Sequence, residues 1–335
     1  MMRMRNKIIG LCASFIVLFV FIRLNAGGVM DYIQAVKGKE AVVTGAESAI
    51  SDEEKAKLRE TIEAEARQRY VEPVDARIDR VWKAIPGYNG LEVDVEKTYQ
   101  QTLASGKTSP IQFVYKEIPP KISLKDLGPW PIYKGNPNKK MIAIMVNVAW
   151  GNEYLPAILD TFDKEKVKAT FFLDGSWLKK YPDVAKQIQE RGHEISNHAY
   201  SHPDMKTLNR QSQYTQISRT EDLIKGTLGA QNKWFAPPSG SYNQTTVQVA
   251  SEQGLMTVLW TLDTVDWQKP SPDWIIRKIS SKLEPGALIL MHPTSSSRDA
   301  LTGMIREAKR QGYALGTVSE TLSSNRLPSA VEQSP

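Results

Sequence analysis

The sequence predicts an α/β protein: a deformed (β/α) barrel of about seven strands, preceded by a membrane-anchor helix and a small α+β module. From residue 141 onward, short apolar runs alternate with helical stretches, which is typical of a parallel sheet with helices outside it. This part spans about 180 residues, fewer than the roughly 250 of an eight-fold barrel, so we expect fewer strands. The N-terminus has the charged-then-apolar order of an export signal.

The composition favours one substantial domain plus something smaller, because 335 residues exceed the size at which single cores stop growing. The 41% of hydrophobic residues exclude disorder throughout the chain. The 43 basic and 37 acidic residues are interspersed, so the net charge of +6 leaves no nucleic-acid footprint, and we expect no nucleic acid as a partner. An ordinary solvated surface of mixed charge is the favoured explanation of the slight basic excess. The alternative is a basic face that suits an anionic cell wall or membrane surface. Cys12 is the only cysteine, which excludes an intramolecular disulfide.

Residues 1–28 are predicted to form a signal or anchor segment. Three basic residues precede the uncharged run 8–22, which is short for a spanning helix because such a helix needs about 17 to 25 apolar residues. We favour an uncleaved membrane anchor with its N-terminus in the cytoplasm and everything else outside. The alternative is a secreted protein whose signal is cleaved after Ala26.

Three further segments are predicted from their local composition. Residues 29–69 form a helical spacer, in which Ser51 and Glu54 make a capping box ahead of strong helix formers. Residues 128–140 are rich in Pro, Gly and Asn without a period, which predicts a linker. Residues 323–335 are expected to be a disordered tail.

Residues 70–127 are predicted to be a small α+β module. Apolar residues at helical spacing predict a helix over 75–85. A short strand, a helix from about Asp94 and a strand over 111–118 then follow. No chemistry is assigned to this module.

The main domain is predicted over residues 141–322. The expected strands are 141–147, 168–173, 193–197, 233–236, 256–261, 287–291 and 312–316. The expected helices are 153–164, 181–191, 211–228, 243–254, 272–282 and 298–310.

Polar residues follow the ends of these strands, where active residues of a barrel are expected. In strand order these are Asn147 with Val148, Asp174, His198 with His202, residues 236–240, residues 263–267, and His292. Three of the four histidines thus fall at one predicted rim. Their clustering indicates a functional site.

The stretches "KATFFLDGSW", "GHEISNHAYSHPDM", "WTLDTVDW" and "ALILMHP" occur in this order within residues 140–320. This part of the chain resembles the polysaccharide deacetylases of carbohydrate esterase family 4, the NodB-homology domain. Taken whole, the chain is most similar to the YlxY-like, sporulation-associated subgroup. The resemblance does not extend convincingly to residues 30–126.

The resemblance implies metal-assisted hydrolysis of N-acetyl groups on amino sugars, with zinc or another divalent metal as cofactor. His198 and His202 match the family's H-x-x-x-H metal ligands; the alternative is two polar rim residues without a metal. The family's two motif aspartates, the base and a metal ligand, correspond to Asn147 and Val148. An amide and an isopropyl group therefore replace two carboxylates, so the first motif is degenerate.

Other family positions are retained or altered. His292 matches the general acid and Asp266 the carboxylate that orients it, although a core histidine capped by a buried carboxylate would look the same. Trp267 matches the aromatic residue that lines the substrate pocket, and a core tryptophan is the alternative. In the third motif Ala236 replaces an arginine, and the substrate-binding positions are Pro238 and Ser239.

Asp174 follows the second predicted strand, next to the first. We therefore consider it as a substitute metal ligand that reaches toward the place vacated at Val148.

Two functions follow from the resemblance. The first is a hydrolase of the cell envelope, anchored in the membrane or secreted to the wall or spore envelope, that deacetylates peptidoglycan, spore cortex or a chitin-like polymer with weak activity. The second is a catalytically inactive deacetylase fold that binds glycan or serves as an envelope scaffold. The degenerate motif favours the second, and the retained histidines favour continued use of the pocket.

Overall fold

The computed structural model describes residues 50–327. The predicted anchor over residues 1–28 and most of the predicted tail lie outside this range. Within the described range, no helix combines the length and apolar character needed to cross a membrane.

The described chain forms two compact units. Among residues 50–327, the smaller unit contains residues 50–64 and 95–112, and the larger unit contains residues 65–94 and 113–327. The predicted 70–127 module is thus divided between the two units.

In the smaller unit, α3 (Asp52–Gln68) begins at the predicted capping box. The Ser51 backbone N–H donates to the Glu54 carboxylate at 2.8 Å, and the Glu54 N–H donates to Ser51 Oγ at 3.2 Å. Glu96 of helix α4 (Val95–Ala104) forms an ion pair with Arg59 of α3, with 2.6 Å between the Glu96 carboxylate oxygen and the Arg59 guanidinium nitrogen. The capping prediction is confirmed.

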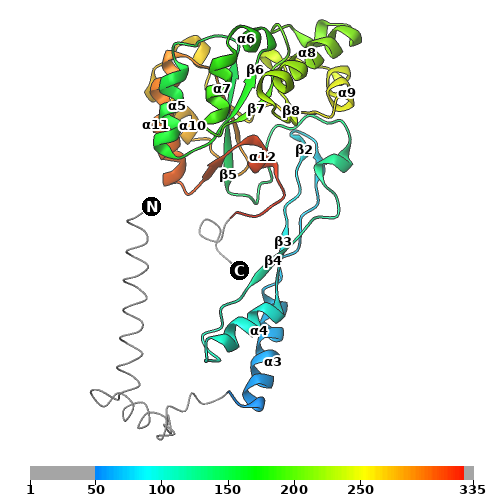
Figure 1. The fold of residues 1–335 in the computed structure, drawn as a ribbon, viewed down its shortest axis with the longest axis vertical. Helices are drawn as coiled ribbons and strands as arrows, with labels where there is room; N and C mark the ends of the chain where they lie inside the picture. The colour runs from blue at the N-terminus through cyan, green and yellow to red at the C-terminus, as the bar shows by residue number, and fades with distance from the viewer. Residues whose placement is uncertain (1–49, 328–335) are drawn as a thin grey trace, which may run out of the picture. The chain divides into compact units, whose positions relative to one another are not determined.

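The larger unit is built around one parallel sheet (Figure 1). Seven strands follow the order β10-β11-β5-β6-β7-β8-β9, and β12 pairs with the first residues of β5. The bounds are β5 Met141–Val148, β6 Thr170–Leu173, β7 Glu194–Asn197, β8 Trp234–Phe235, β9 Met256–Thr257, β10 Leu262–Asp263, β11 Leu288–Met291 and β12 Ala314–Gly316. The α/β barrel prediction is confirmed as an incompletely closed barrel. The predicted fifth strand, 256–261, is reduced to β9 at its start, and β10 begins just beyond its end.

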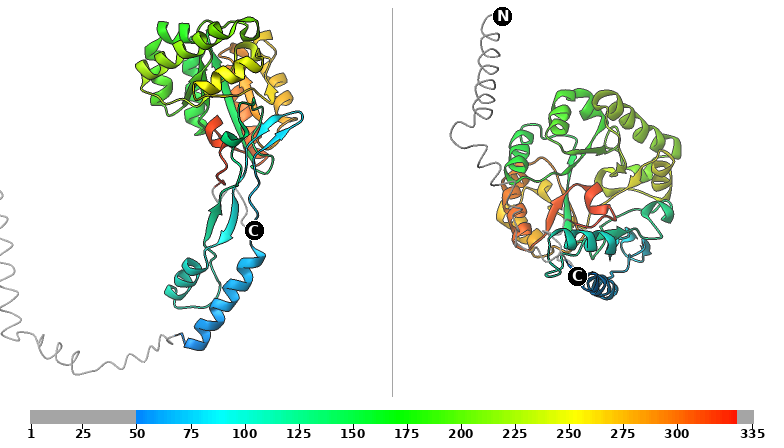
Figure 2. Two further views of the ribbon diagram at one scale, coloured as in Figure 1. Left: turned by 90° about the vertical axis from the view of Figure 1, so that its right-hand side faces the viewer. Right: turned by 60° about the horizontal axis from the view of Figure 1, so that its bottom comes forward.

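Helices surround this sheet, as the right-hand view of Figure 2 shows. Their bounds are α5 Leu155–Glu165, α6 Gly175–Lys180, α7 Pro182–Glu190, α8 Arg210–Leu228, α9 Gln244–Glu252, α10 Pro272–Ser280, α11 Ser295–Arg310 and α12 Val318–Leu322. Helix α6 was not expected. It begins after Asp174, whose carboxylate accepts the Trp177 backbone N–H at 3.0 Å. Asp174 is thus the N-cap that stabilises the first turn of this helix.

Strand β5 carries two buried faces because successive side chains point to opposite sides of a sheet. Val146 and Val148 pack in the cluster between the sheet and the helices. Ala143 and Met145 pack in the cluster inside the barrel. Asn147 follows the second set, so it faces inward while Val148 faces the helices.

Residues 128–140 are not a free linker. Ile132 forms a bridge with Val258 next to β9, and Lys134 forms one with Ala287 next to β11. Ile132 is 1% exposed, and the buried Asn136 donates to the Pro86 carbonyl. This segment therefore lies between the two ends of the open sheet. It crosses this gap once as an extended chain, which agrees with the absence of a helical or strand pattern in its sequence.

Residues 75–85 form a hairpin, so the predicted helix there is wrong. Strands β1 (Arg77–Asp79) and β2 (Lys83–Ile85) pair antiparallel. Asp79 Oδ1 accepts the N–H groups of Val81 and Trp82, each at 2.8 Å, which closes the turn locally. The apolar residues at helical spacing thus belong to the two strands, which hold Ile78 and Ile85, and to the turn between them, which holds Val81 and Trp82.

A second antiparallel pair joins β3 (Gly90–Val93) with β4 (Tyr115–Ile118), which follows α4 in the chain. A Cβ at Gly90 would lie 2.3 Å from the Val71 carbonyl oxygen, so only glycine fits there. The start of the predicted disordered tail is also fixed, since Arg326 donates to the Asn89 carbonyl at 2.9 Å.

Candidate functional site

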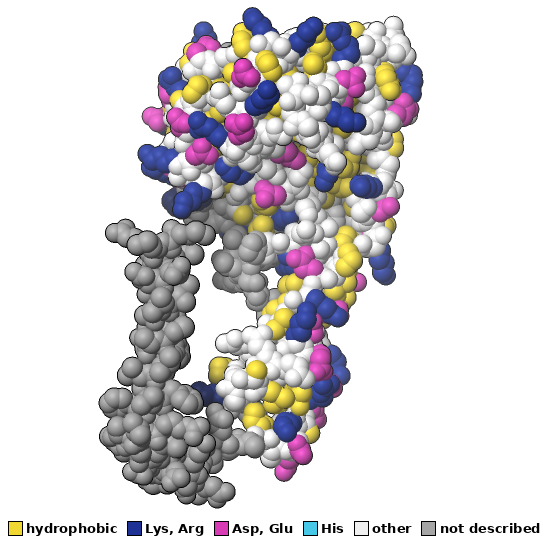
Figure 3. Space-filling model, in the orientation of Figure 1, with side chains coloured by type: hydrophobic (Ala, Val, Ile, Leu, Met, Phe, Trp, Pro, Cys, Tyr) yellow, Lys and Arg dark blue, Asp and Glu magenta, His cyan; other side chains and the backbone are white. Residues whose placement is uncertain are grey.

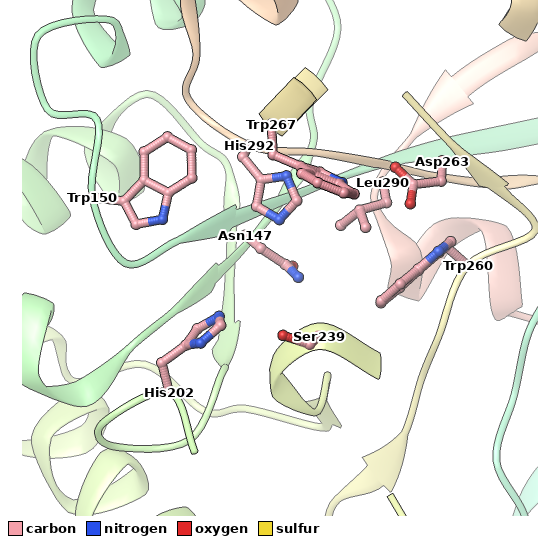
Figure 4. Close-up of a pocket in the computed structure, with 9 residues that line it drawn as sticks. All are labelled: Asn147, Trp150, His202, Ser239, Trp260, Asp263, Trp267, Leu290 and His292. Carbon is pink, nitrogen blue, oxygen red and sulfur yellow. The ribbon is translucent and has the colours of Figure 1, made fainter. Parts of the chain in front are cut away.

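A cavity of about 430 Å³ opens at the carboxyl ends of the barrel strands (Figure 4). The residues that line it are Asn147, Trp150, His202, Ser239, Trp260, Asp263, Trp267, Leu290 and His292. The cavity therefore combines aromatic walls with a few convergent polar groups, the usual character of a small-molecule or sugar site.

One wall holds a fixed histidine. Asp266 is fully buried and accepts two hydrogen bonds from His292, from the ring Nδ1 at 2.9 Å and from the backbone N–H at 2.6 Å. The carboxylate thereby sets the tautomer, with the proton on Nδ1 and Nε2 left as the free ring nitrogen. This juxtaposition is the one expected for His292 and Asp266 from the sequence.

Three tryptophans form the apolar walls. Trp150 stacks on His292 with ring centroids 5.9 Å apart and an interplanar angle of 9°. Trp267 is 58% exposed and Trp150 47% exposed, so their faces are available to a ligand. The core interpretation of Trp267 is therefore wrong.

Sequence reasoning did not single out Trp150, Trp260 or Leu290 as site residues. Trp150 comes directly after the degenerate first motif and Leu290 just before the histidine of "ALILMHP". Their proximity to recognised motifs was the available signal. Their orientation into one cavity depends on the barrel.

His198 and His202 lie together, with ring centroids 5.2 Å apart in an edge-to-face arrangement. His198 is 1% exposed, and its Nδ1 lies 2.7 Å from the Ala236 carbonyl oxygen, which makes Nδ1 the donor. Burial lowers the pKa of His198 to about 3, so the ring is neutral and keeps a lone pair on Nε2. Only His202 of the pair reaches the cavity wall.

The expected third ligand does not join this pair. Val148 packs against the helix side of the sheet and has no donor atom. Asp174 uses Oδ1 to cap α6, accepting from Trp177 and Ser176. Its Oδ2 is buried without a hydrogen-bond partner, and burial raises the pKa of the carboxyl.

Across residues 50–327, no group of three or more His, Cys, Asp or Glu side chains is placed to hold a metal ion. Two imidazoles fall short of the three protein ligands of a catalytic zinc site. The donor set around His198 and His202 therefore does not fit the metal of the family's chemistry. Asp174 does not complete it in this structure.

The position of the missing base is occupied by an inward-facing amide. Asn147 is 3% exposed, lines the cavity and leaves its Oδ1 without a hydrogen-bond partner. Ser239 lines the cavity opposite, and Pro238 is buried behind it. Ala236, where the family has arginine, contributes a backbone carbonyl and no charge.

Backbone strain is concentrated around this cavity. Ala199, His202, Ser239 and Val265 all have φ between 52° and 60°, although none is glycine. Such conformations cost of order 1–3 kcal/mol each and persist where surrounding structure enforces them. The chain thus maintains the shape of the pocket although two of its acids are gone.

The polysaccharide deacetylase family model matches residues 134–258. The chain is 44% identical over 298 residues to the uncharacterized protein YlxY of Bacillus subtilis, covering 89% of this chain and 91% of the relative. It is 32% identical over 249 residues to a peptidoglycan-N-acetylglucosamine deacetylase of Bacillus cereus, covering 68% of this chain and 90% of the relative.

Among solved structures, a wild-type CE4-family pseudoenzyme from Bacillus anthracis is 44% identical with a TM-score of 0.75, covering 81% of this chain and 96% of that chain. A mutant of that protein, described as having restored enzymatic activity, is 43% identical with the same TM-score and covers 81% of this chain and 99% of its own. The fold, the order of the motifs and these similarities agree, and the chain belongs to the polysaccharide deacetylase family, carbohydrate esterase family 4.

Proposed function

We propose that this protein is a catalytically inactive polysaccharide deacetylase of the cell envelope, which binds an amino-sugar polymer such as peptidoglycan in the cavity. The single observation that carries the proposal is the pair Asn147 and Val148 on opposite faces of β5. The first offers no proton acceptor near neutral pH, and the second offers no ligand.

The loss of turnover follows from these two positions. Removing a general base costs about 10²- to 10⁴-fold in rate. Without a third protein ligand, a metal at His198 and His202 lacks the support of a catalytic site. The site therefore lacks both groups on which metal-assisted hydrolysis depends.

The cavity can still bind a sugar. Flat indole faces at Trp150 and Trp267 suit the apolar face of a pyranose ring. Asn147, Ser239 and Asp263 supply hydrogen-bonding groups between those walls. His292, held by Asp266, presents Nε2 as a further polar group.

Two relatives support the proposal. The Bacillus anthracis neighbour is itself a pseudoenzyme, and a mutant of it regained activity, which indicates that this fold can lose turnover and keep its architecture. The Bacillus cereus relative is a peptidoglycan-N-acetylglucosamine deacetylase, which points to an amino-sugar polymer as the ligand.

Slow deacetylation is the second candidate. The intact His292–Asp266 pair favours it, because this pair matches the family's acid and has been kept with both hydrogen bonds. In that case zinc or another divalent metal would be held by His198 and His202 with ligands from water or substrate.

For location, we propose an extracytoplasmic protein that is tethered by residues 1–28 or secreted to the wall or spore envelope. The order of basic and apolar residues in the sequence supports it.

The test compares acetate release with binding. We expect the wild-type protein to bind N-acetylated chitooligomers or peptidoglycan fragments by calorimetry, and Trp267→Ala to weaken that binding by about tenfold, since a lost aromatic face costs on the order of 1 to 2 kcal/mol. We expect little or no acetate from the wild type, and more from Asn147→Asp with Val148→Asp. A wild-type turnover of about 1 s⁻¹ or faster would contradict the proposal.

A further inference from the structure

We propose that the tip of the β1–β2 hairpin is a peripheral contact surface for an anionic lipid bilayer. The hairpin, light blue in Figure 2, protrudes at the side of the barrel. The hairpin patch consists of Arg77, Ile78, Arg80, Val81, Lys121 and Ile122. It lies entirely in the larger unit and is independent of the glycan cavity.

The patch presents aliphatic side chains to solvent. Val81 is 66% exposed, the highest value among the exposed large hydrophobic residues of the described chain, and Ile78 and Ile122 are each 41% exposed. They belong to adjoining segments, because the Ala76 N–H donates to the Ile122 carbonyl at 2.9 Å. Ile78 and Ile122 therefore lie on adjoining segments, and Val81 lies in the turn that follows the strand of Ile78.

The structure holds Val81 outward. Asp79 Oδ1 accepts the N–H groups of both Val81 and Trp82 and so fixes the turn. The Trp82 ring points the other way, lying 6.4 Å from the Tyr133 ring centroid and 5.3 Å from Lys134 Nζ. The contacts of Trp82 and the hydrogen bonds from the turn to Asp79 fix the backbone on both sides of Val81. The folded structure therefore keeps Val81 exposed.

Around these aliphatic groups three basic side chains, Arg77, Arg80 and Lys121, stand against two acidic ones, Asp75 and Asp79. On the face shown in Figure 3, basic and acidic side chains are intermixed over the barrel, which makes a local excess notable. Arg77, Arg80 and Lys121 are exposed, and none forms an ion pair within residues 50–327. Asp75 and Asp79 instead bond to backbone N–H groups.

This chemistry selects a lipid surface. Cations without ion-pair partners complement anionic headgroups, and aliphatic side chains between them enter the acyl boundary. A wall glycan is disfavoured because the patch exposes aliphatic groups and no flat aromatic face. Each basic residue near an anionic surface strengthens binding by about fivefold, so reversing two of them reduces it by at least about 25-fold.

The experiment uses the full chain with a local readout, so that binding through the N-terminus does not mask the result. Cys12 is the only cysteine, and therefore Cys12→Ser with Val81→Cys gives one labelling site for an environment-sensitive fluorophore. We expect quenching by brominated acyl chains in mixed phosphatidylglycerol and phosphatidylcholine vesicles, but not in phosphatidylcholine alone. Added salt should reduce it.

Two matched variants control for labelling and for net charge. A label at Tyr214→Cys on α8, 43% exposed, should remain unquenched. Arg80→Glu with Lys121→Glu should abolish quenching at position 81, whereas Lys225→Glu with Lys233→Glu, exposed residues elsewhere on the same unit, should not. Unchanged thermal unfolding verifies that each variant is folded. The proposal is overturned if the label at 81 stays as silent as that at 214, if both charge reversals act equally, or if uncharged vesicles quench equally well.

Discussion

At the scale of single residues, Asn147 and Val148 decide what this pocket can do. Asn147 matches the position of the family's base, lines the cavity and leaves its Oδ1 without a hydrogen-bond partner. Val148 instead contributes to the cluster beneath the helices. One substitution therefore changes the chemistry of the cavity, while the other strengthens the hydrophobic core.

Val148→Asp should lower the free energy of unfolding by about 3 kcal/mol, because it places a carboxylate without a partner in an apolar cluster. Urea unfolding at neutral pH measures the loss, which should shrink at acidic pH as the carboxyl is protonated. Val148→Ala, which removes packing without adding charge, should show no such pH dependence. A Val148→Asp protein as stable as wild type would mean that this side chain turns into the cavity.

In the double variant Asn147→Asp with Val148→Asp, zinc should raise the melting temperature by several degrees, because the substitution at position 147 adds a carboxylate to the cavity that His202 also lines, and a ligand that binds only the folded state stabilises it. The wild type, with two imidazoles, should respond less. Thermal unfolding with and without zinc measures both. Equal shifts would show that the new carboxylate at position 147 does not contribute to metal binding.

At the scale of elements, short segments hold the site residues in place. The 3₁₀ helix Asp266–Gln268 starts from Val265, a β-branched residue at φ 54°. This turn aims Asp266 at His292. The hairpin at 75–85 shows the same principle, since Asp79 closes a turn where apolar spacing alone indicates a helix.

Val265→Gly should raise the free energy of unfolding by about 1 kcal/mol, because relief of left-handed strain exceeds the added entropy of the unfolded chain. Val265→Ala should change it less, since alanine keeps a Cβ in the same conformation. Chemical denaturation compares the two variants. A loss of stability in the glycine variant would indicate that Val265 packing outweighs strain.

At the scale of the whole molecule, stability should depend on two buried neutral histidines. Burial lowers the pKa of His198 to about 3 and that of His193 to about 4. When the pH falls below about 6.5, the ordinary pKa of histidine, the unfolded chain binds protons that the folded chain does not. The free energy of unfolding therefore falls with falling pH. The stabilisation is present above about pH 6.5 and is lost between there and about pH 4, by up to about 1.4 kcal/mol per histidine per pH unit.

His193→Asn should make this pH dependence shallower, because an asparagine side chain does not titrate. The substitution also keeps an acceptor in place of Nδ1, which accepts the Ala169 N–H at 3.1 Å. Asp174 and Glu221, whose carboxyl pKa values are raised by burial, act in the opposite direction and bind protons in the folded state. Unfolding free energies measured from pH 7 to 4 test the difference. Parallel curves for both proteins would contradict the role of His193.

Local patterns in the sequence are sufficient to predict the family and the order of strands and helices along the chain. They also predict that His198, His202, Asp266 and His292 lie at one rim. These follow from local patterns: apolar periodicity, capping residues and contiguous motifs. The sequence also shows that Asn147 and Val148 replace the family's two aspartates, because the identity of a side chain can be read without a structure.

Only the tertiary structure decided which of these residues share a cavity. The pleat of β5 sends Asn147 inward and Val148 outward, and the cap of α6 engages one oxygen of Asp174. Residues 132–134 fill the sheet gap by pairing with positions more than 100 residues away, which no local pattern specifies. The physical reason is that orientation and long-range pairing depend on packing between distant segments, whereas propensity acts within a few residues.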